Sequence, residues 1–516
     1  MRLIISASFL IKGAIMENRK AGVLLHISSL PSKYGIGTLG IEAYRFIDFL
    51  VNSKMSIWQI LPLGPTGYGD SPYSAISSVG LNYYFISFDT LRAKGLLKIS
   101  DYKYVKKLSN PRRVDYGMLF NEKLKILRIA YNNFDKNDSE FVSFVKEGTY
   151  NDFALFMTLK NKNSFNPWYM WSEDEKNYSA SLEIKIISDY KDDYLFFLWT
   201  QFEFLNEWYN LKKYANKKGI EIMGDIPLYL SYDSVEVWKE PELFKLDKDK
   251  NMKFVAGCPP DGYSPLGQLW GNPVYDWNYM KKDNYKWWSN RIYYLFKLYD
   301  YLRLDHFRGF DRYYEIKAGA ADAREGTWED GPKFDLFKDK LNLKIVVEDL
   351  GVLDEGVYKL MSEVKYPGMK ILQEAFDSNP NNIHKPTNTT ENFIMYTASH
   401  DGMPTQGLID MMDEKWFNNF SSELKKERQA FGLVTKEITK KNALNLMIEL
   451  AYRSRAKYVI LPTQDILGQG ADFRMNLPGN VSSSNWSYRV LPHELNIFVA
   501  NRLKKLAGRY KRWLKM

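Results

Sequence analysis

The chain has 516 residues, of which 45% are hydrophobic and 26% are charged. This composition supports a large core and a solvated surface, and it excludes a disordered chain, a collagen-like fibre and a small disulfide scaffold. A transmembrane helix needs about 18 consecutive apolar residues, and no apolar run of this chain comes close to that length. No membrane partner is therefore expected. Cys258 is the only cysteine. An internal disulfide is therefore impossible, and a cytoplasmic location is expected.

The net charge of +9 has two interpretations. A nucleic acid or another anionic partner would account for it, and so would lysines spread over solvated helix faces. Acidic residues are interleaved with basic ones throughout the chain, and no dense basic stripe is present. The second interpretation is favoured, and no nucleic-acid partner is expected.

Residues 1–15 are an apolar N-terminal extension that superficially resembles a secretory signal. No clear small-residue cleavage site follows, and the polar residues 16–20 lead into the first predicted strand. We interpret residues 1–15 as translated upstream of a start at Met16. Residues 16–516 are then expected to form a single folded body.

Eight short apolar runs, each ending in polar or glycine-rich residues, predict strands. They cover residues 22–28, 57–63, 220–227, 301–307, 344–349, 369–373, 392–400 and 458–464. Helical sequence separates most of them, and strands that alternate with helices indicate parallel βαβ units. The pattern predicts an α/β fold of the (β/α)8, or TIM-barrel, type, in which functional residues collect at the carboxyl ends of the strands.

Two intervals are much longer than one crossover helix requires. The interval between the second and third predicted strands contains amphipathic sequence, which predicts an inserted, largely helical subdomain at about 85–215. The interval after the third strand, at about 228–288, is rich in Gly, Pro, Trp and Tyr. Long ordered loops on the top face of a barrel commonly build clefts, so this second insertion is expected to cover a substrate cleft.

Three of the predicted strands end in carboxylates. Strand alternation puts Arg303 and Asp305 on one face, and an arginine beside a carboxylate favours the ionised form that a nucleophile needs. Glu348 follows an apolar strand, where burial raises the pKa of a carboxyl toward that of a general acid. Asp401 follows His400 at the end of the seventh predicted strand. Acids that face one cleft on a barrel are typical of glycosyl transfer through an oxocarbenium-like transition state.

Each of these segments also has a purely structural interpretation. Arg303 and Asp305 could form a buried pair that only holds a strand end in place. Glu348 or Asp349 could cap the helix that follows. The spacing of the residues alone does not decide between these interpretations and catalysis.

Motifs for metals and cofactors are absent from the sequence. None of the five histidines forms a His-x-x-x-His cluster, and Cys-x-x-Cys pairs are lacking. Neither a phosphate-binding P-loop nor a Gly-x-Gly-x-x-Gly turn after a strand occurs. We therefore expect no metal and no cofactor, and chemistry that depends on side-chain acids.

Several blocks in a fixed order carry a resemblance to a known family. They are residues 21–37 (AGVLLHISSLPSKYGIG), 58–73 (WQILPLGPTGYGDSPY), 224–227 (GDIP), 267–273 (GQLWGNP), 303–310 (RLDHFRGF), 347–351 (VEDLG) and 474–479 (RMNLPG). With them the chain closely resembles, from about residue 21 to 491, the 4-α-glucanotransferases of glycoside hydrolase family 77, also called amylomaltases or disproportionating enzymes. The resemblance implies a catalytic barrel that transfers α-1,4-glucan segments between maltodextrins, or to glucose, with retention and without cofactor or calcium.

The resemblance also implies residue roles. Asp305 looks like the nucleophile, Glu348 like the acid/base, and Asp401 like the third acid, which grips sugar hydroxyls. Substrate-binding roles are implied for a further set: Tyr73, Asp225, Gln268, Trp270, Arg303, His306 and His400. In the family pattern Tyr73 would stack on the reacting sugar, Asp225 would contact it, Arg303 would hold Asp305 ionised, and Gln268 and Trp270 would line the acceptor side.

One departure from the family pattern leaves alternatives open. The family's third-acid block usually continues His-Asp-Asn-Asp/Glu-Thr, whereas this chain has Gly402 and Pro404 after Asp401. The alternatives are an α-1,4-glucan hydrolase that uses the same acids and a glucan-binding protein without turnover. Because all three acids persist, an active transferase is expected.

Overall fold

The structure is a computed structural model, and it describes residues 19–261, 264–351, 353–435 and 437–513. The expected extension at 1–15 lies outside the described residues. The division of the remaining chain into one barrel with an inserted subdomain stays a prediction.

Eight parallel strands form the central sheet. They are β1 (Lys20–Leu24), β2 (Ile57–Gln59), β3 (Glu221–Ile226), β6 (Tyr301–Leu304), β9 (Ile345–Val347), β10 (Gly368–Ile371), β11 (Phe393–Tyr396) and β12 (Tyr458–Pro462). Their order is β10-β11-β12-β1-β2-β3-β6-β9, and neighbouring strands are parallel. Each strand overlaps one of the eight predicted apolar runs. The (β/α)8 prediction is confirmed.

The barrel closes between β9 and β10 through hydrogen bonds at their ends. The Val347 N–H donates to the Pro367 carbonyl at 2.9 Å. Asp349 accepts from the Met369 N–H and pairs with the Lys370 ammonium at 3.2 Å. Asp349 is therefore a buried link between strands and not the helix cap considered above.

The helix cap in this region lies five residues further on. The side chain of Asp354 accepts from the Val357 N–H, and this bond caps α15 (Glu355–Val364). A cap satisfies one of the backbone donors that the first helical turn leaves free.

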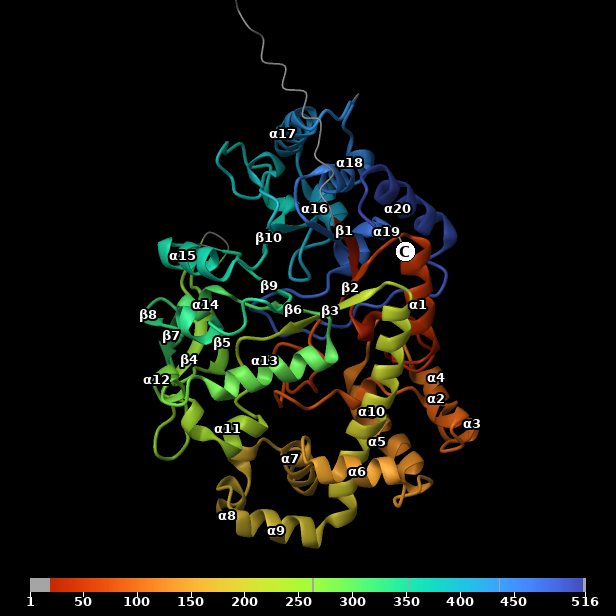
Figure 1. Ribbon diagram of the computed structural model, residues 1–516, viewed down its shortest axis with the longest axis vertical. Helices are drawn as coiled ribbons and strands as arrows, with labels where there is room; N and C mark the ends of the chain where they lie inside the picture. The colour runs from red at the N-terminus through yellow and green to blue at the C-terminus, as the bar shows by residue number, and fades with distance from the viewer. Residues whose placement is uncertain (1–18, 262–263, 352, 436, 514–516) are drawn as a thin grey trace, which may run out of the picture.

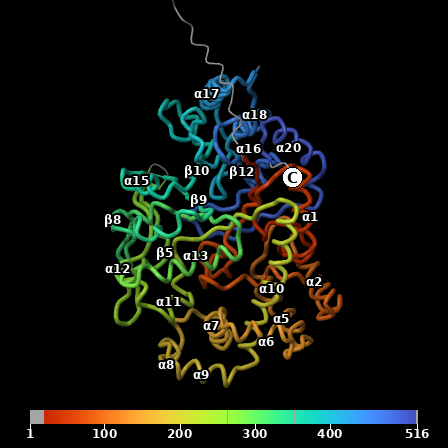
Figure 2. Tube along the Cα trace, in the orientation of Figure 1, coloured from red at the N-terminus to blue at the C-terminus, as the bar shows by residue number. Residues whose placement is uncertain are grey.

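Helices pack around the barrel (Figure 1). The principal ones are α1 (Ile41–Asn52), α10 (Lys191–Lys217), α13 (Lys286–Leu298), α15, α16 (Thr405–Met411), α17 (Glu414–Ala430), α18 (Lys440–Arg453), α19 (Thr463–Leu467) and α20 (Ile497–Arg509). On α1 the buried residues Ala43, Phe46, Ile47 and Leu50 recur at the spacing of one helix face. Helices α1 and α20 contact each other, and Figure 2 shows them side by side. No helix of the described residues is long and apolar enough to cross a membrane.

The segment between β2 and α10 is helical, as predicted for the insertion after the second strand. It contains α2 (Phe88–Ala93), α3 (Ile99–Tyr102), α4 (Val105–Leu108), α5 (Tyr116–Asn132), α6 (Ser139–Glu147), α7 (Asn151–Lys162), α8 (Glu173–Lys176) and α9 (Ala180–Asp189). Aromatic rings hold it together: Phe202 of α10 contacts Phe134 and Phe141 at centroid distances of 6.1 and 5.5 Å. In Figure 1 helices α6 to α9 lie at the end of the molecule opposite α17.

A second, antiparallel sheet was not predicted. It consists of β4 (Phe254–Cys258), β5 (Gln268–Pro273), β7 (Arg312–Lys317) and β8 (Thr327–Asp330) in the order β5-β4-β7-β8. The expected loop at 228–288 thus includes two strands, as well as the short helices α11 (Val235–Lys239) and α12 (Trp277–Lys281). Strands β7 and β8 follow β6 and α14 (Arg308–Asp311), at the place where a regular barrel has a crossover helix.

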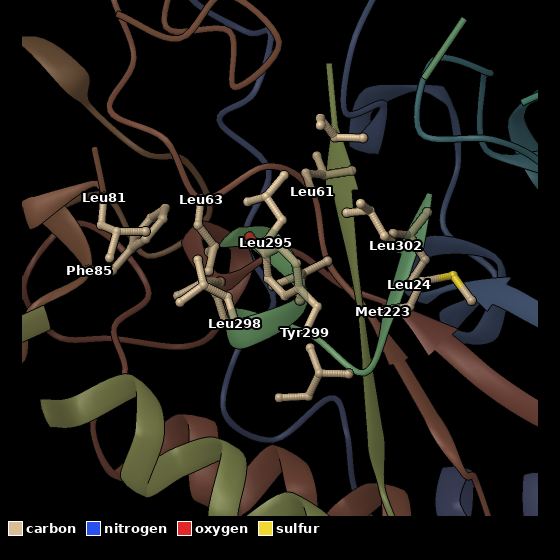
Figure 3. Close-up of a cluster of buried hydrophobic side chains, with 14 of the residues drawn as sticks. Leu24, Leu61, Leu63, Leu81, Phe85, Met223, Leu295, Leu298, Tyr299 and Leu302 are labelled. Carbon is tan, nitrogen blue, oxygen red and sulfur yellow. The ribbon is translucent and has the colours of Figure 1, made fainter. Parts of the chain in front are cut away.

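The core extends from the barrel wall to the loop after β2. Figure 3 shows this region with side chains from the barrel strands, from the loop and from α13, including Leu24, Met223, Leu302, Leu61, Leu63, Leu81, Phe85, Leu295, Leu298 and Tyr299. Gly224 on β3 lies against this cluster. A Cβ at Gly224 would lie 2.2 Å from the Tyr299 ring, so only glycine fits there without displacing the ring.

Candidate active site

A cleft of about 520 Å³ opens at the carboxyl ends of the barrel strands. Among the residues of the sequence prediction, those that line it are Tyr73, Gln268, Trp270, Asp305, His306, Glu348, His400 and Asp401. Asp225 and Arg303 are the exceptions: their side chains are 0% and 1% exposed and lie beneath the cleft floor. Residues separated by more than 400 positions therefore meet, because the ends of parallel strands share one face of the barrel.

Arg303 on β6 is the cation at the centre of this floor. Its guanidinium lies 2.5 Å from Asp225 Oδ2, 3.1 Å from Glu348 Oε2 and 3.3 Å from Asp305 Oδ1. A planar guanidinium carries donors in a fixed fork, which allows one side chain to pair with several carboxylates. Arg303 thus fixes the relative positions of the three acids around it.

Asp305 and Glu348 are close enough to share a hydrogen bond, and their protonation is coupled. Burial and the neighbouring Glu348 charge raise the pKa of Asp305 well above its usual range. Burial also acts to raise the pKa of Glu348, but Arg303, the His306 N–H and the bond to Asp305 outweigh it and lower that pKa to about 2. The two carboxyl groups are thus shifted in opposite directions, and the ionised form is favoured more at Glu348 than at Asp305. Arg303 lowers the pKa of both carboxyl groups, as expected for Asp305, but at Asp305 burial and the Glu348 charge outweigh it.

His306 connects the ends of β6 and β9. Its N–H donates to Glu348 Oε2 at 2.8 Å, and its φ of 45° lies in the left-handed region that non-glycine residues seldom adopt. Such backbone strain is concentrated at functional sites. The ring of His306 meets the Trp270 ring edge-on at a centroid distance of 5.0 Å, and burial lowers its pKa to about 4. His306 is therefore neutral at pH 7.

Tyr73 forms one wall, from the loop after β2. Its ring is parallel to that of His400, with centroids 5.0 Å apart and planes inclined by 1°, and its hydroxyl donates to Asp225 Oδ2 at 2.8 Å. Asp225 is fully buried under this wall and does not line the cleft. The direct sugar contact expected for Asp225 is not provided by this geometry; its carboxylate instead holds the Tyr73 hydroxyl and the Arg303 guanidinium.

Asp401 is held by the loop after β12. The Asn476 amide donates to Asp401 Oδ1 at 2.7 Å, and Arg474 donates to its backbone carbonyl at 2.5 Å. The sequence alone does not single out either residue as a partner of Asp401, because a separation of more than 70 positions carries no spacing signal.

The altered segment after Asp401 is anchored. The Gln373 amide donates to the Met403 carbonyl at 2.6 Å and to Thr405 Oγ1 at 3.1 Å. The buried Asp465 accepts from the Thr405 N–H at 2.7 Å. Replacement of the usual residues by Gly402 and Pro404 thus leaves the segment bound to the turn that follows β10 and to α19.

Gln268 and Trp270 project from β5 of the second sheet. The Trp270 indole N–H donates to Gln268 Oε1 at 3.0 Å. Both side chains are part-buried and line the cleft. The second sheet therefore brings an aromatic side chain to a site whose acids come from the barrel.

Two aromatic residues of the cleft were missed by the sequence analysis. Tyr229 lines it from the loop after β3, and Trp486 lines it near Tyr73, at a ring distance of 5.7 Å. The chain has 36 tyrosines and 14 tryptophans, so an aromatic residue in a loop is no distinctive signal.

Within the described ranges, no group of three or more His, Cys, Asp or Glu side chains has the arrangement of a metal site. Arg303 is the cation that pairs with Asp225, Asp305 and Glu348.

Comparison with known proteins identifies the family. A family model described as 4-alpha-glucanotransferase matches residues 25–494. The chain is 41% identical to the 4-alpha-glucanotransferase of Clostridium butyricum, over 95% of this chain and 100% of the relative, and 39% identical to that of Aquifex aeolicus (strain VF5), over 96% and 99%. It is also similar to the structure of the amylomaltase from Streptococcus agalactiae in complex with acarbose, with a TM-score of 0.90 and 37% identity over 96% of this chain and 100% of that one. The chain belongs to the 4-α-glucanotransferase family.

Proposed function

We propose that Asp305, Glu348 and Asp401 carry out the 4-α-glucanotransferase reaction of this chain. Its substrates are α-1,4-glucans, that is maltodextrins and fragments of starch or glycogen, with a second glucan or glucose as acceptor. The observation that carries the assignment is the Asp305–Glu348 pair on the cleft floor, in which both carboxyl groups bind one buried arginine. Carboxyl groups this close favour a retaining double displacement, because an inverting enzyme needs about 6.5–9.5 Å between them.

In the first displacement a carboxylate oxygen of Asp305 attacks the anomeric carbon of the donor glucan. The bond from this carbon to the glycosidic oxygen breaks, and Glu348 protonates that oxygen as it leaves. The product is a glycosyl-enzyme ester on Asp305 and a shortened glucan. Asp401 grips hydroxyl groups of the reacting sugar, and these contacts stabilise the distorted ring of the transition state.

The second displacement reverses the first with a new partner. The 4-hydroxyl group of the acceptor attacks the anomeric carbon and gives its proton to Glu348, while the ester bond to Asp305 breaks. Two inversions restore the α configuration. The same residue serves as acid and then as base, as microscopic reversibility requires.

The first step needs a proton on Glu348 and an ionised Asp305, whereas in the free protein the pKa of Asp305 is raised and that of Glu348 is lowered. We propose that the bound sugar separates the two carboxyl groups. Asp305 then faces a carbon that gains positive charge, which favours its ionised form, and Glu348 faces an oxygen that must accept a proton. Substrate binding thus places the proton on the acid that uses it.

Transfer prevails over hydrolysis only if water is kept from the glycosyl-enzyme. Gln268 and Trp270 of β5 lie beside His306 at the reacting end of the cleft, where an acceptor sugar would replace water. The segment after Asp401 is anchored, which favours an active enzyme over a glucan-binding protein without turnover. We also propose a cytoplasmic location, on the grounds of the single cysteine.

The test of the acid assignment uses two isosteric variants. Asp305→Asn is expected to bind maltodextrin but to form no covalent intermediate. Glu348→Gln is expected to lose transfer between natural glucans by at least about 10²-fold, since general acid–base help is typically worth about 10²–10⁴-fold. An α-glucosyl fluoride needs no proton to release its leaving group. Glu348→Gln should therefore accumulate the adduct from this donor, as measured by intact mass.

The controls separate the residue assignment from the activity. Maltotriose with the wild-type chain should give glucose and longer maltodextrins at nearly constant total reducing ends. Growth of reducing ends without longer products would identify a hydrolase, and no change would identify a binding protein. An adduct on Asp305→Asn, or normal maltotriose turnover by Glu348→Gln, would overturn the roles of these two residues.

A further inference from the structure

A second large groove lies apart from the catalytic acids, between α13 of the barrel and the helices α7 and α11. Its volume is about 440 Å³, close to that of the active-site cleft. Trp287, Asn290, Arg291, Tyr294 and Lys297 form its α13 wall. They recur every three or four residues, which is the spacing of one helix face. None of the three catalytic acids lines this groove.

Two buried side chains in the groove wall have unused hydrogen-bonding atoms. Glu236 is 5% exposed; its Oε1 accepts from the Ser78 N–H and hydroxyl at 2.7 and 2.6 Å, while Oε2 has no partner among the described residues. Arg291 is 4% exposed, and its Nε and Nη1 have no acceptor within the described chain, although the Tyr275 hydroxyl approaches the guanidinium. A buried polar atom without a partner costs about 1–3 kcal/mol. These atoms have almost no exposed surface, so a ligand group gains by satisfying them only where the groove wall shifts to admit it.

The charges in the groove indicate what kind of ligand fits. Its acids are Asp152, Glu236 and Glu240, and its bases are Lys239, Arg291 and Lys297. Asp152 and Lys239 pair with each other, and the two acids and two bases that remain favour neither an anion nor a cation. They offer acceptors and donors side by side, which is the requirement of a neutral ligand with many hydroxyl groups.

Aromatic side chains complete the groove. Trp287 and Tyr294 are part-buried, and Tyr293 at the rim is 42% exposed. Such rings pack against the apolar faces of pyranose sugars while polar neighbours bind the hydroxyl groups. The floor is rigid, because the Tyr294 hydroxyl is bonded to the Val79 carbonyl and to the Tyr150 hydroxyl, each at 2.8 Å.

We infer that this groove is a second, non-catalytic α-glucan-binding site, formed by α13 and the Glu236 and Arg291 side chains. The inference rests on α-glucans being the substrates of the cleft. A glucan long enough to occupy both sites would be held at two points. Its dissociation is then slower than that of maltotriose, because rebinding at one site is intramolecular while the other is occupied.

The test blocks the groove at Asn290, an exposed residue of its α13 wall. Asn290→Trp places a large side chain in the groove without removing a buried group. The control is Lys504→Trp, which puts the same side chain at an exposed position of α20. Tyr293→Ala, which removes the rim ring, is a second variant that does not depend on filling the groove.

Binding is measured by titration calorimetry with maltoheptaose in the Asp305→Asn background, in which no turnover occurs. We expect two molecules bound per chain, reduced to one by Asn290→Trp and unchanged by Lys504→Trp. In native gels with soluble starch, the apparent affinity of Asn290→Trp for starch should fall by at least about tenfold, because avidity is lost. The apparent affinity of Tyr293→Ala should also fall.

Turnover of maltotriose separates this inference from the proposed function. Asn290→Trp in the otherwise wild-type chain should disproportionate maltotriose within twofold of the wild-type rate, which also shows that it is folded. One maltoheptaose site in the parent protein, or two sites after Asn290→Trp, would overturn the second site and leave the catalytic proposal intact. Failure of the wild-type chain on maltotriose would instead overturn the proposed function.

Discussion

At the scale of single residues, the site depends on one arginine that is shared among several acids. Arg303 lies within 3.3 Å of Asp225, Asp305 and Glu348. A buried charge is stable only when it is paired and hydrogen-bonded, so these residues are mutually dependent. The pairing lowers the pKa of Glu348, whereas at Asp305 burial and the Glu348 charge raise the pKa.

This arrangement predicts stability changes of opposite sign for two isosteric substitutions. Because the folded protein raises the pKa of Asp305, ionisation of this group opposes folding above the unfolded pKa of about 3.9, which lowers stability at pH 7. Asp305→Asn removes this cost, and the protein should become more stable at pH 7. The gain should vanish below about pH 4, where the unfolded aspartate is protonated as well.

Glu348→Gln should do the reverse. The folded pKa of about 2 stabilises the protein above the unfolded pKa of about 4.3, and this stability is lost as the pH falls through 2. At pH 7 the variant should be less stable by about 1–3 kcal/mol. Urea unfolding of both variants between pH 4 and pH 8 measures the two differences. If both substitutions changed the stability at pH 7 in the same direction, the opposite pKa shifts of the two residues would be contradicted.

At the scale of elements, closure of the barrel depends on one ion pair between neighbouring strands. Asp349 and Lys370 are 2% and 5% exposed and join the ends of β9 and β10. Asp349→Ala leaves the Lys370 ammonium buried and unpaired, which costs about 3–5 kcal/mol. The cap variant Asp354→Ala, five residues away, should cost only about 1 kcal/mol. Equal losses in chemical denaturation would mean that the pair does not close the barrel.

We expect the second sheet to influence the ratio of transfer to hydrolysis. Trp270 on β5 contacts His306 of the barrel, so it can exclude water from the glycosyl-enzyme while an acceptor binds. Trp270→Ala should raise the ratio of hydrolysis to transfer on maltotriose by about tenfold, equivalent to about 1.4 kcal/mol between the two transition states. Leu266→Ala, at a residue that is 54% exposed just before β5, is the control. The ratio of reducing-end growth to longer products measures the effect, and an unchanged ratio would assign water exclusion to other residues.

At the scale of the whole molecule, the barrel was predictable because each of its strands is buried on both faces. Such strands are continuous apolar runs, and each of the eight runs overlaps a strand. The second sheet was not predictable in the same way. Strand β5 reads QLWGNP, and it contains Gly271 and Pro273. Glycine and proline are typical of turns and loops, so the sequence of β5 does not indicate a strand.

The sequence motifs predict which residues belong to the site, but not how those residues interact. Blocks such as RLDHFRGF and VEDLG mark Asp305 and Glu348, and the structure brings the predicted residues together. The interactions that decide their protonation depend on distances across the barrel floor, such as that from Arg303 to Glu348. The burial of Asp225 and the support of Asp401 by Asn476 likewise arise from folding, and no spacing in the chain encodes them.

The net charge of the whole molecule leads to a last prediction. A charge of +9 accelerates the encounter with an anionic partner and makes it sensitive to salt. The substrates of this chain are neutral, and the ion pairs of the floor are buried, so salt screens them little. The kcat/KM for maltotriose should therefore change less than twofold between 50 and 500 mM NaCl, and the migration of labelled DNA at low salt should be unaffected by the protein. A drop of more than tenfold, or retarded DNA, would show that the positive charge serves an anionic ligand.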